Sequence, residues 1–321
     1  MTVIAFLLIF ISVFLHVAWN MLSKGTTPSL AFYSLMSFTA AAIWMPFFAA
    51  SDICLTQMPL NFYLLAAGSV AGEIIYMIGL AYGYKKSDIS LVYPVVRALP
   101  VMMIALITTI FGLGRQLDMW NYVGMLLISC GCFLMPLTSL KNFSFKAYCS
   151  SVLVFILLGA AGTTMYTIFD SSAIKIVRDI STKISVADTL GYLFLIEAFM
   201  ALGELAVVRC SREEWSCFKK LLRRPLYPVI AGVCSSSAYG LVLFAMGYVT
   251  NVSFLQAFRQ ISLPVGFIAG VAIFHEKPYP TKVAGVIIIV SGLLIMIFCG
   301  PFLTKKNCRK SIGSAAVFLC F

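Results

Sequence analysis

Four charged side chains lie within long apolar stretches of the sequence, where packing alone does not account for them. Glu73 and Glu197 are near the middle of two such stretches, and Arg97 and Arg259 lie in two others. A charge near the centre of a bilayer-spanning helix costs at least about 2.5–3.5 kcal/mol on insertion scales. Each of the four therefore calls for a partner, a cavity, or a function in binding or proton transfer.

The two glutamates are candidates for proton coupling. Tyr76 follows Glu73 by three residues, so the two would share one face of a helix. Glu204 follows Glu197 by seven residues, nearer the end of its stretch. A carboxyl group facing a cavity could bind and release a proton as the cavity changes access. The alternative at each position is a structural glutamate that is protonated or hydrogen-bonded, and we assign the coupling function to Glu73 and Glu197.

The two arginines are candidates for an anion site. Tyr93 precedes Arg97 by four residues and Gln256 precedes Arg259 by three, so each pair forms a polar stripe on its helix. A guanidinium can bind a carboxylate or a phosphate with two parallel hydrogen bonds. The alternative is an arginine that pairs with one of the two glutamates or extends to the membrane surface.

Further polar and aromatic side chains could line the same cavity. His16 and Asn20 are four residues apart with Trp19 between them, and Tyr166 and Asp170 are also four apart. The alternatives are helix packing for His16 and Asn20, an interfacial anchor for Trp19, and solvation for Asp170 near its helix end. The substrate-binding candidates are His16, Trp19, Asn20, Tyr76, Tyr93, Arg97, Tyr166, Gln256 and Arg259.

Small residues indicate close helix packing. Gly68 and Gly72 have the small-xxx-small spacing that lets transmembrane helices approach, and a serine run at 235–237 precedes Tyr239. We assign Tyr239 to packing as well. None of the glycines has the strand–loop–helix setting of a phosphate-binding loop, so nucleotide binding is not expected.

The amino-acid composition indicates that the helices carrying these residues lie in a lipid bilayer. Of 321 residues, 61% are hydrophobic and 11% charged, and the mean hydropathy is +0.99. Soluble domains carry about 25% charged residues. We therefore predict an all-α integral membrane protein. The net charge of +11 lies in short loops and the tail, which is typical of membrane-segment flanks and not of nucleic-acid binding.

Metal and redox chemistry are poorly supported. The ten cysteines are scattered with no CxxC pair, and there are two histidines, His16 and His275. We expect no metal site, no cofactor and no enzymatic activity.

Ten stretches are long enough to cross a bilayer, which takes roughly 20 mostly apolar residues. The first is read as a retained helix because it lacks a basic leader and a cleavage site. The longest connections are 170–187 and the charged 209–225, which we interpret as an interfacial segment. The basic tail at 304–321 either lies on the membrane surface or is disordered. The predicted spans are 3–22, 30–50, 61–83, 90–113, 119–138, 148–169, 188–208, 226–248, 253–274 and 281–302.

An internal repeat organises these spans into two five-helix halves, 1–140 and 141–303. Because five is odd, consecutive halves must enter the membrane from opposite sides, an architecture typical of secondary transporters. The matched features are Gly83-Tyr84 with Gly247-Tyr248, Ser90 and Arg97 with Ser253 and Arg259, Pro100 with Pro264, and the pair Gly124 and Gly131 with the pair Gly285 and Gly292.

The sequence resembles the EamA-type, ten-helix members of the drug/metabolite transporter superfamily over about residues 3–302. The first helix has the family's histidine, Trp-Asn pair and following lysine, and the ninth has its arginine–serine pattern with a glutamate at the next turn. The first half has Gly114-Arg115-Gln116 in place of that turn, so no transport role is assigned to the glutamate. The matching residues are His16, Trp19, Asn20, Lys24, Arg259, Ser262, Pro264, Gly270, Glu276 and Gly285.

The resemblance implies two intertwined halves around a central cavity, with export or exchange of metabolites, amino acids or drugs. It also implies that both termini are cytoplasmic. The loop cations point the other way, because lysines and arginines are more frequent on the side opposite the termini, mostly in 209–225. We adopt the orientation that the family implies.

We therefore expect a multi-pass protein of the bacterial inner membrane that acts as a secondary exporter or exchanger of a small metabolite, amino acid or drug-like solute. Its partners would be that solute and the lipid bilayer, and it would be a monomer or homodimer. Proton coupling and plain exchange both stay open. The alternatives are a membrane-embedded lipid-modifying enzyme, which the separated histidines disfavour, and a receptor or scaffold that does not transport.

Overall fold

The computed structural model describes residues 2–24, 29–86, 89–137, 151–180, 185–275 and 277–299, so Glu276 and the predicted 304–321 tail lie outside the described residues. Within these ranges the ordered elements are all helical. The helices are α1 (Val3–Lys24), α2 (Leu30–Ala49), η1 (Leu55–Gln57), α3 (Leu60–Lys86), α4 (Ile89–Ile110), α5 (Met119–Leu134), α7 (Ser151–Ile180), α8 (Val186–Cys210), α9 (Arg212–Arg223), α10 (Leu226–Met246), α11 (Val252–Phe258), η3 (Arg259–Ile261), α12 (Ser262–Phe274) and α13 (Pro280–Phe298).

The helices have the length and surface of a multi-pass membrane protein. In the described part of the chain, nine helical segments are long and apolar enough to cross a membrane, with α11, η3 and α12 forming one of them. The shorter α5 is also apolar, at 16 residues. Large apolar side chains such as Ile110, Met119 and Phe298 are more than 70% exposed, as expected of a surface solvated by lipid. The predicted all-α membrane class is confirmed.

One predicted boundary is wrong, and one predicted span has an internal interruption. The connection expected at 170–187 is helical up to Ile180, because α7 has 30 residues. Asp170 is therefore inside a helix and not near its end. The ninth span, expected at 253–274, is present at Val252–Ile273 and contains the 3₁₀ turn η3, which begins at Arg259.

Polar side chains begin several helices in the usual way, by accepting a hydrogen bond from a backbone N–H of the first turn. Ser29 accepts from Phe32 at the start of α2, and Asn251 accepts from Ser253 at the start of α11. These caps fix where the apolar stretches become helix.

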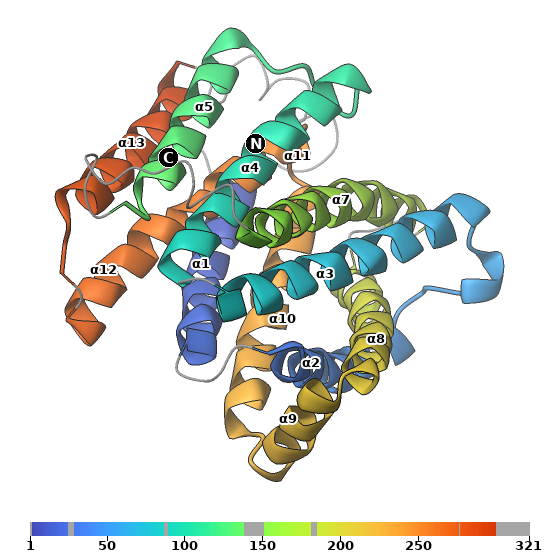
Figure 1. Ribbon diagram of the computed structural model, residues 1–321. Helices are drawn as coiled ribbons and strands as arrows, with labels where there is room; N and C mark the ends of the chain where they lie inside the picture. Colours follow the sequence, from blue (N-terminus) through green and yellow to red (C-terminus); the bar gives the residue numbers. More distant parts are fainter. Residues whose placement is uncertain are drawn as a thin grey trace.

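Helices distant in sequence pack in pairs (Figure 1). α3 lies along α7, α2 along α8, α5 along α13, and α1 along α10. The α5–α13 pair lies at one end of the molecule and α2, α8 and α9 at the other, with α1 and α10 between them. This arrangement brings the middles of α1, α3, α7 and α10 together in the interior.

Glycines allow the closest of these crossings. A Cβ on Gly124 would lie 2.7 Å from the carbonyl oxygen of Gly292, and one on Gly292 would lie 2.6 Å from that of Gly124. Gly131 and Gly285 have the same reciprocal relation, with 2.6 and 2.7 Å. These four glycines let α5 and α13 approach closely. The packing role predicted for Gly72 is confirmed at the α3–α7 crossing, where an added Cβ would lie 2.8 Å from the Tyr166 backbone nitrogen.

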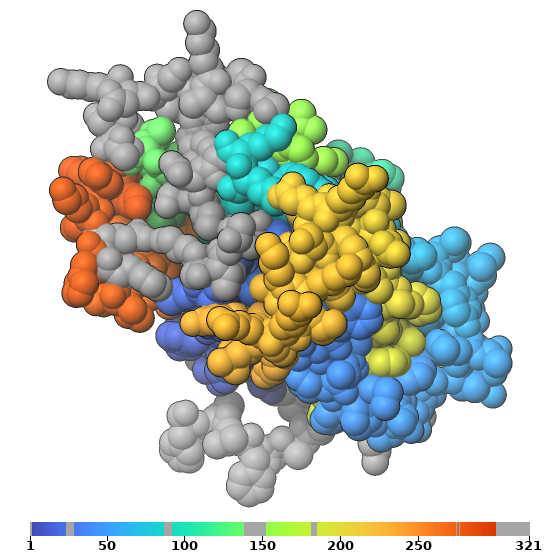
Figure 2. Space-filling model, turned by 60° about the horizontal axis from the view of Figure 1, so that its bottom comes forward, coloured from blue at the N-terminus to red at the C-terminus, as the bar shows by residue number. Residues whose placement is uncertain are grey.

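The charged segment expected at 209–225 contains the amphipathic helix α9, which is capped by Ser211. Figure 2 shows this gold segment at the surface beside the blue segment of α2. Its one deeply buried carboxylate, Glu214, accepts hydrogen bonds from the Ala31 backbone N–H at 2.9 Å and from Lys85 Nζ at 2.6 Å. α9 is therefore attached to the start of α2 and the end of α3.

Candidate functional site

A cavity lies in the interior where α1, α2, α3, α4, α7, α8, α10 and η3 meet. Its empty volume is about 750 Å³, including the part open to solvent. The charged and aromatic side chains on its wall are His16, Trp19, Glu73, Tyr76, Arg97, Tyr166, Glu197, Tyr239 and Arg259. A mostly apolar space with a few converging polar groups is the usual form of a small-molecule site.

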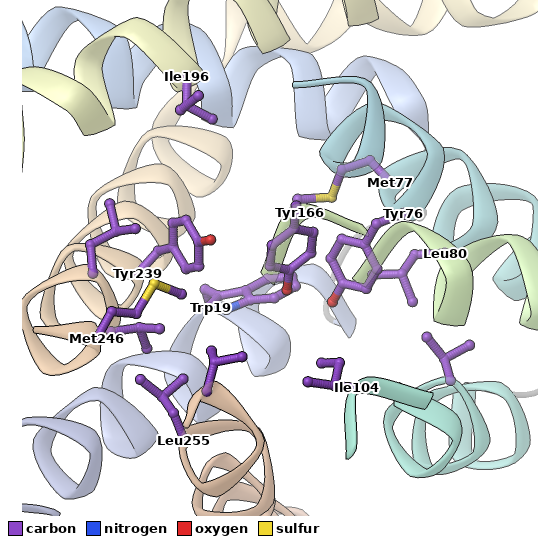
Figure 3. Close-up of a cluster of buried hydrophobic side chains, with 14 of the residues drawn as sticks. Trp19, Tyr76, Met77, Leu80, Ile104, Tyr166, Ile196, Tyr239, Met246 and Leu255 are labelled. Atoms are coloured by element: carbon purple, nitrogen blue, oxygen red, sulfur yellow. The ribbon is translucent and has the colours of Figure 1, made fainter. Parts of the chain in front are cut away.

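Three tyrosine rings form a continuous aromatic wall. Figure 3 shows Tyr76, Tyr166 and Tyr239 side by side, with Trp19 beneath them. The ring centroids of Tyr76 and Tyr166 are 5.9 Å apart and those of Tyr166 and Tyr239 are 5.6 Å apart, each pair edge to face. The rings come from α3, α7 and α10, so the wall spans both halves of the chain.

Arg97 is held by the protein itself. Its Nε donates to Gln260 Oε1 at 3.2 Å, and its Nη2 donates to the Arg259 carbonyl at 2.8 Å and to Ser262 Oγ at 3.0 Å. Its Nη1 lies 2.8 Å from His16 Nε2. Three hydrogen bonds from the guanidinium thus go to protein acceptors, and a fourth N–H group is directed at the His16 ring. Arg97 therefore binds the 3₁₀ turn at Arg259, and few of its N–H groups remain to bind a ligand.

His16 is approached by more donors than one imidazole can satisfy. Trp19 Nε1 donates toward Nδ1 at 3.1 Å, while Arg97 Nη1 and the Tyr93 hydroxyl lie at 2.8 and 3.0 Å from Nε2. Trp and Arg side chains only donate, and a neutral imidazole has one acceptor nitrogen. The imidazole can thus accept from Trp19 or from Arg97, but not from both at once.

Arg259 is placed differently from Arg97 although the two match in the repeat. It is 8% exposed, and its Nη1 makes a long 3.5 Å hydrogen bond to Gln256 Oε1. Its guanidinium lies 5.8 Å from the centre of the Tyr239 ring, with the Tyr166 side chain beside it. Among the described residues no carboxylate lies within 4.0 Å of it. Arg259 is thus a buried cation in the cavity wall, with Gln256 and Tyr166 as side-chain hydrogen-bond partners.

Two carboxyl groups also line the cavity. Glu73 of α3 is 7% exposed and Glu197 of α8 is 8% exposed. Glu204, two turns after Glu197, is fully buried between α8 and α2, where Ser37 donates to its Oε2 at 3.0 Å. Its Oε1 has no partner among the described residues. The acidic groups thus extend from the cavity along α8.

Asp170 is not solvated, contrary to the alternative that the sequence left open. It is fully buried, and its carboxylate accepts hydrogen bonds from the hydroxyls of Tyr192, at 2.6 Å, and Tyr239. Tyr239 in turn lies against Arg259 in the cavity wall. Asp170 therefore orients a wall residue from behind and does not face the cavity.

The structure brings most of the predicted candidates to one cavity, and their binding roles stay predictions. Three candidates are behind its wall instead. Asn20 bonds to the His16 carbonyl, Tyr93 contacts His16 and stacks under Arg97, and Gln256 is buried beside Arg259. Trp19 is 2% exposed, which excludes the interfacial-anchor alternative.

Tyr239 was assigned to packing, but it lines the cavity. The repeat could have identified it, because the alignment that matches Arg97 with Arg259 brings Tyr76 within one residue of Tyr239.

In the described ranges no group of three or more histidine, cysteine, aspartate or glutamate side chains could hold a metal ion.

No family model matches the chain, and no curated protein matches it. A crystal structure of a protein is similar in fold, with 15% sequence identity, a TM-score of 0.65, and coverage of 94% of this chain and 99% of that one. At this identity the similarity concerns the fold alone.

Proposed function

We propose that this protein is a secondary transporter that carries a small organic solute by alternating access. The observation that carries the proposal is the charged cavity, to which Glu73 and Arg97 come from the first half of the chain and Glu197 and Arg259 from the second. Ionisable residues inside a membrane bundle typically mark a substrate or ion pathway. A site between two halves of a bundle is accessible from either side by rocking one half against the other.

The proposal includes two inverted five-helix repeats, over 1–140 and 141–303. The glycine contacts support it. In the repeat alignment Gly124 corresponds to Gly285, and Gly131 to Gly292. Exchanging the two halves turns the contact of Gly124 with Gly292 into a contact of Gly285 with Gly131. The structure has both contacts. Such reciprocity is expected of two halves related by a two-fold axis.

The helix pairs support the same relation. Exchanging the halves replaces α1 by α7 and α3 by α10, which turns the α3–α7 pair into the α10–α1 pair. The α2–α8, α5–α13 and α4–α11 pairs are each converted into themselves. All of these pairs are in contact. This agreement supports our proposal, first drawn from the sequence resemblance, that the chain is an EamA-type drug/metabolite transporter.

In this mechanism the substrate lies against the tyrosine wall, and protons on Glu73 or Glu197 couple its movement to a gradient. Arg97 acts as a positioning residue that holds the η3 turn through its bonds to Gln260, Ser262 and the Arg259 carbonyl. Arg259 contacts the substrate.

The test is counterflow by the purified full chain in liposomes, with a panel of amino acids, organic acids, phosphorylated metabolites and cationic drugs. We expect accumulation of at least one labelled solute, which Arg259→Gln or Glu73→Gln abolishes. The surface variant Glu213→Gln is the matched control, because Glu213 is largely exposed on α9 and remote from the cavity wall. Conversion of a lipid by the purified protein, without flux of any solute, would instead favour the enzyme alternative.

A further inference from the structure

Glu204 is buried where α2 of the first half packs against α8 of the second. Its Oε2 lies 3.0 Å from Ser37 Oγ, and its Oε1 has no hydrogen-bond partner in the part of the chain that the structure describes. Ser37 itself lines the cavity. A single hydroxyl group therefore connects this buried carboxyl group to the cavity.

The contacts of Ser37 indicate which form of the carboxyl group fits the site. Ser37 Oγ is 3.0 Å from Glu204 Oε2 and 3.2 Å from the Tyr33 carbonyl oxygen. A serine hydroxyl has one hydrogen to donate, and a carbonyl oxygen only accepts. Both contacts can be full hydrogen bonds only when Ser37 donates to Tyr33 and Oε2 carries a proton that it donates to Ser37. The neutral acid thus satisfies this geometry, whereas the carboxylate has to share one hydrogen with the Tyr33 carbonyl.

The electrostatic surroundings favour the same form. The ionisable groups close enough to interact with Glu204 are Glu73 of α3, Glu197 of α8 and Tyr33 of α2, all of which are acidic. The helix α10 packs against both α2 and α8 and has no charged residue. No lysine or arginine of the described ranges lies within 4.0 Å of Glu204. A buried carboxylate without a cation is strongly destabilising, and an unpaired oxygen of a neutral acid is much less so.

We propose that Glu204 is a further proton-binding site, which holds a proton while α2 and α8 are in contact and exchanges it with the cavity through the Ser37 hydroxyl. The protonation itself follows from the contacts of the site. Its use in transport rests on the proposed function.

The transfer needs no group beyond these two residues and water in the cavity. The proton on Oε2 moves to the Ser37 oxygen, while the hydroxyl hydrogen of Ser37 passes to a water molecule on the cavity side. The carboxylate that remains accepts a hydrogen bond from the re-formed hydroxyl. Because this carboxylate is unfavourable at a closed α2–α8 contact, release of the proton favours the conformation in which the two helices have parted. Proton release is thereby linked to the relative position of the two halves.

The first experiment is infrared difference spectroscopy of the purified full chain at neutral pH. The difference between wild type and Glu204→Gln should contain the C=O stretching band of a neutral carboxylic acid. Glu213→Gln is the matched control and should remove a carboxylate band instead, because Glu213 is 80% exposed. If Glu204→Gln does not fold, Glu204→Asp should shift the frequency of the same neutral-acid band. Changes confined to carboxylate bands would overturn the proposal.

The second experiment tests the route through Ser37. Heavy water shifts the band of a neutral acid when its proton is replaced by deuterium, and a Glu204→Gln difference isolates that band in each background. Ser37→Ala should slow the replacement at least about 10-fold, which corresponds to a barrier higher by about 1.4 kcal/mol. Ser34→Ala is the control, because Ser34 is fully buried on the same helix, has no hydroxyl partner among the described residues and does not line the cavity. Equal rates in the two variants would refute the route.

Flux assays separate this site from the transport function. A neutral-acid band at Glu204 in a protein without counterflow of any solute would refute transport and leave the proton site in place. Counterflow by a protein in which Glu204 is ionised would refute the proton site and leave transport in place. Where both hold, a pH gradient should accelerate solute uptake by wild type and not by Glu204→Gln. Equal acceleration in the two would refute the link between this proton and the movement of the halves.

Discussion

Arg97 of α4 donates a 2.8 Å hydrogen bond to the main-chain carbonyl of Arg259, so one repeat-related arginine holds the backbone of the other. The same carbonyl also accepts hydrogen bonds from the Ser262 backbone N–H and from the Ser262 hydroxyl, at 2.8 Å for the hydroxyl. The two arginines therefore have different functions, although they occupy matching positions in the sequence repeat.

Arg97→Lys should lower stability more than Arg259→Lys does. A lysine in place of Arg97 cannot reach Gln260, Ser262 and the Arg259 carbonyl together, and each lost charged hydrogen bond is worth about 1.5–3 kcal/mol. The measurement is thermal and denaturant unfolding of both variants in the same detergent. An equal or reversed order would show that Arg97 is not the structural member of the pair.

Tyr192→Phe should destabilise the protein by about 1–3 kcal/mol, because it removes a donor from the buried Asp170 carboxylate. Tyr33→Phe is the matched control: Tyr33 is equally buried, and its hydroxyl has a weaker 3.4 Å contact with Ser23. Unfolding of the two variants should differ by at least about 1 kcal/mol. A smaller loss in Tyr192→Phe than in Tyr33→Phe would contradict the role given to Asp170.

Gly131→Ala should destabilise the α5–α13 crossing by about 1–3 kcal/mol, because the added Cβ would lie 2.6 Å from the Gly285 carbonyl oxygen. Gly266→Ala is the control, since a Cβ there meets only Val17 Cγ2 at 3.9 Å. That variant should be neutral or slightly stabilised, because alanine favours helix over glycine. Unfolding curves of both variants test the prediction, and equal stabilities would exclude a tight contact.

Glu214→Gln should cost about 1–3 kcal/mol of stability, whereas Glu213→Gln should change it by less than about 0.5 kcal/mol. Both carboxylates contact Lys85, but the Glu214 side chain is 2% exposed and the Glu213 side chain 80% exposed. Glu214 also accepts from the Ala31 backbone N–H. Comparable losses in the two variants would mean that burial does not strengthen this contact.

The apolar length of each stretch was sufficient to predict the helices, because spanning a bilayer requires a continuous internally hydrogen-bonded segment. Length and composition do not reveal interruptions that other helices stabilise. The turn at Arg259 receives a hydrogen bond from Arg97, 162 residues earlier, and local sequence gives no indication of a contact at that separation. In the same way, the burial of Asp170 within α7 is compensated by tyrosines on α8 and α10, whose hydroxyls donate to its carboxylate.

The residue types at the cavity could be predicted because charge is rare in apolar helices. The sequence could not predict which of these side chains face the cavity. Helical spacing shows that two residues share a face of a helix, but it does not show whether that face lies against the cavity or against another helix. Asn20 and Gln256 share stripes with His16 and Arg259, yet neither lines the cavity. Asn20 donates to the His16 carbonyl, and Gln256 accepts from the Arg259 side chain.

The bonds of Arg97 connect α1 and α4 to η3, in the half that begins after residue 140. Parting the halves at this point would leave several charged donors without acceptors inside the membrane, which is the most expensive place to do so. Under the alternating access proposed above, the cavity can open at this point only if these hydrogen bonds break. Opening at the Arg97 contacts would therefore be the costlier of the two movements.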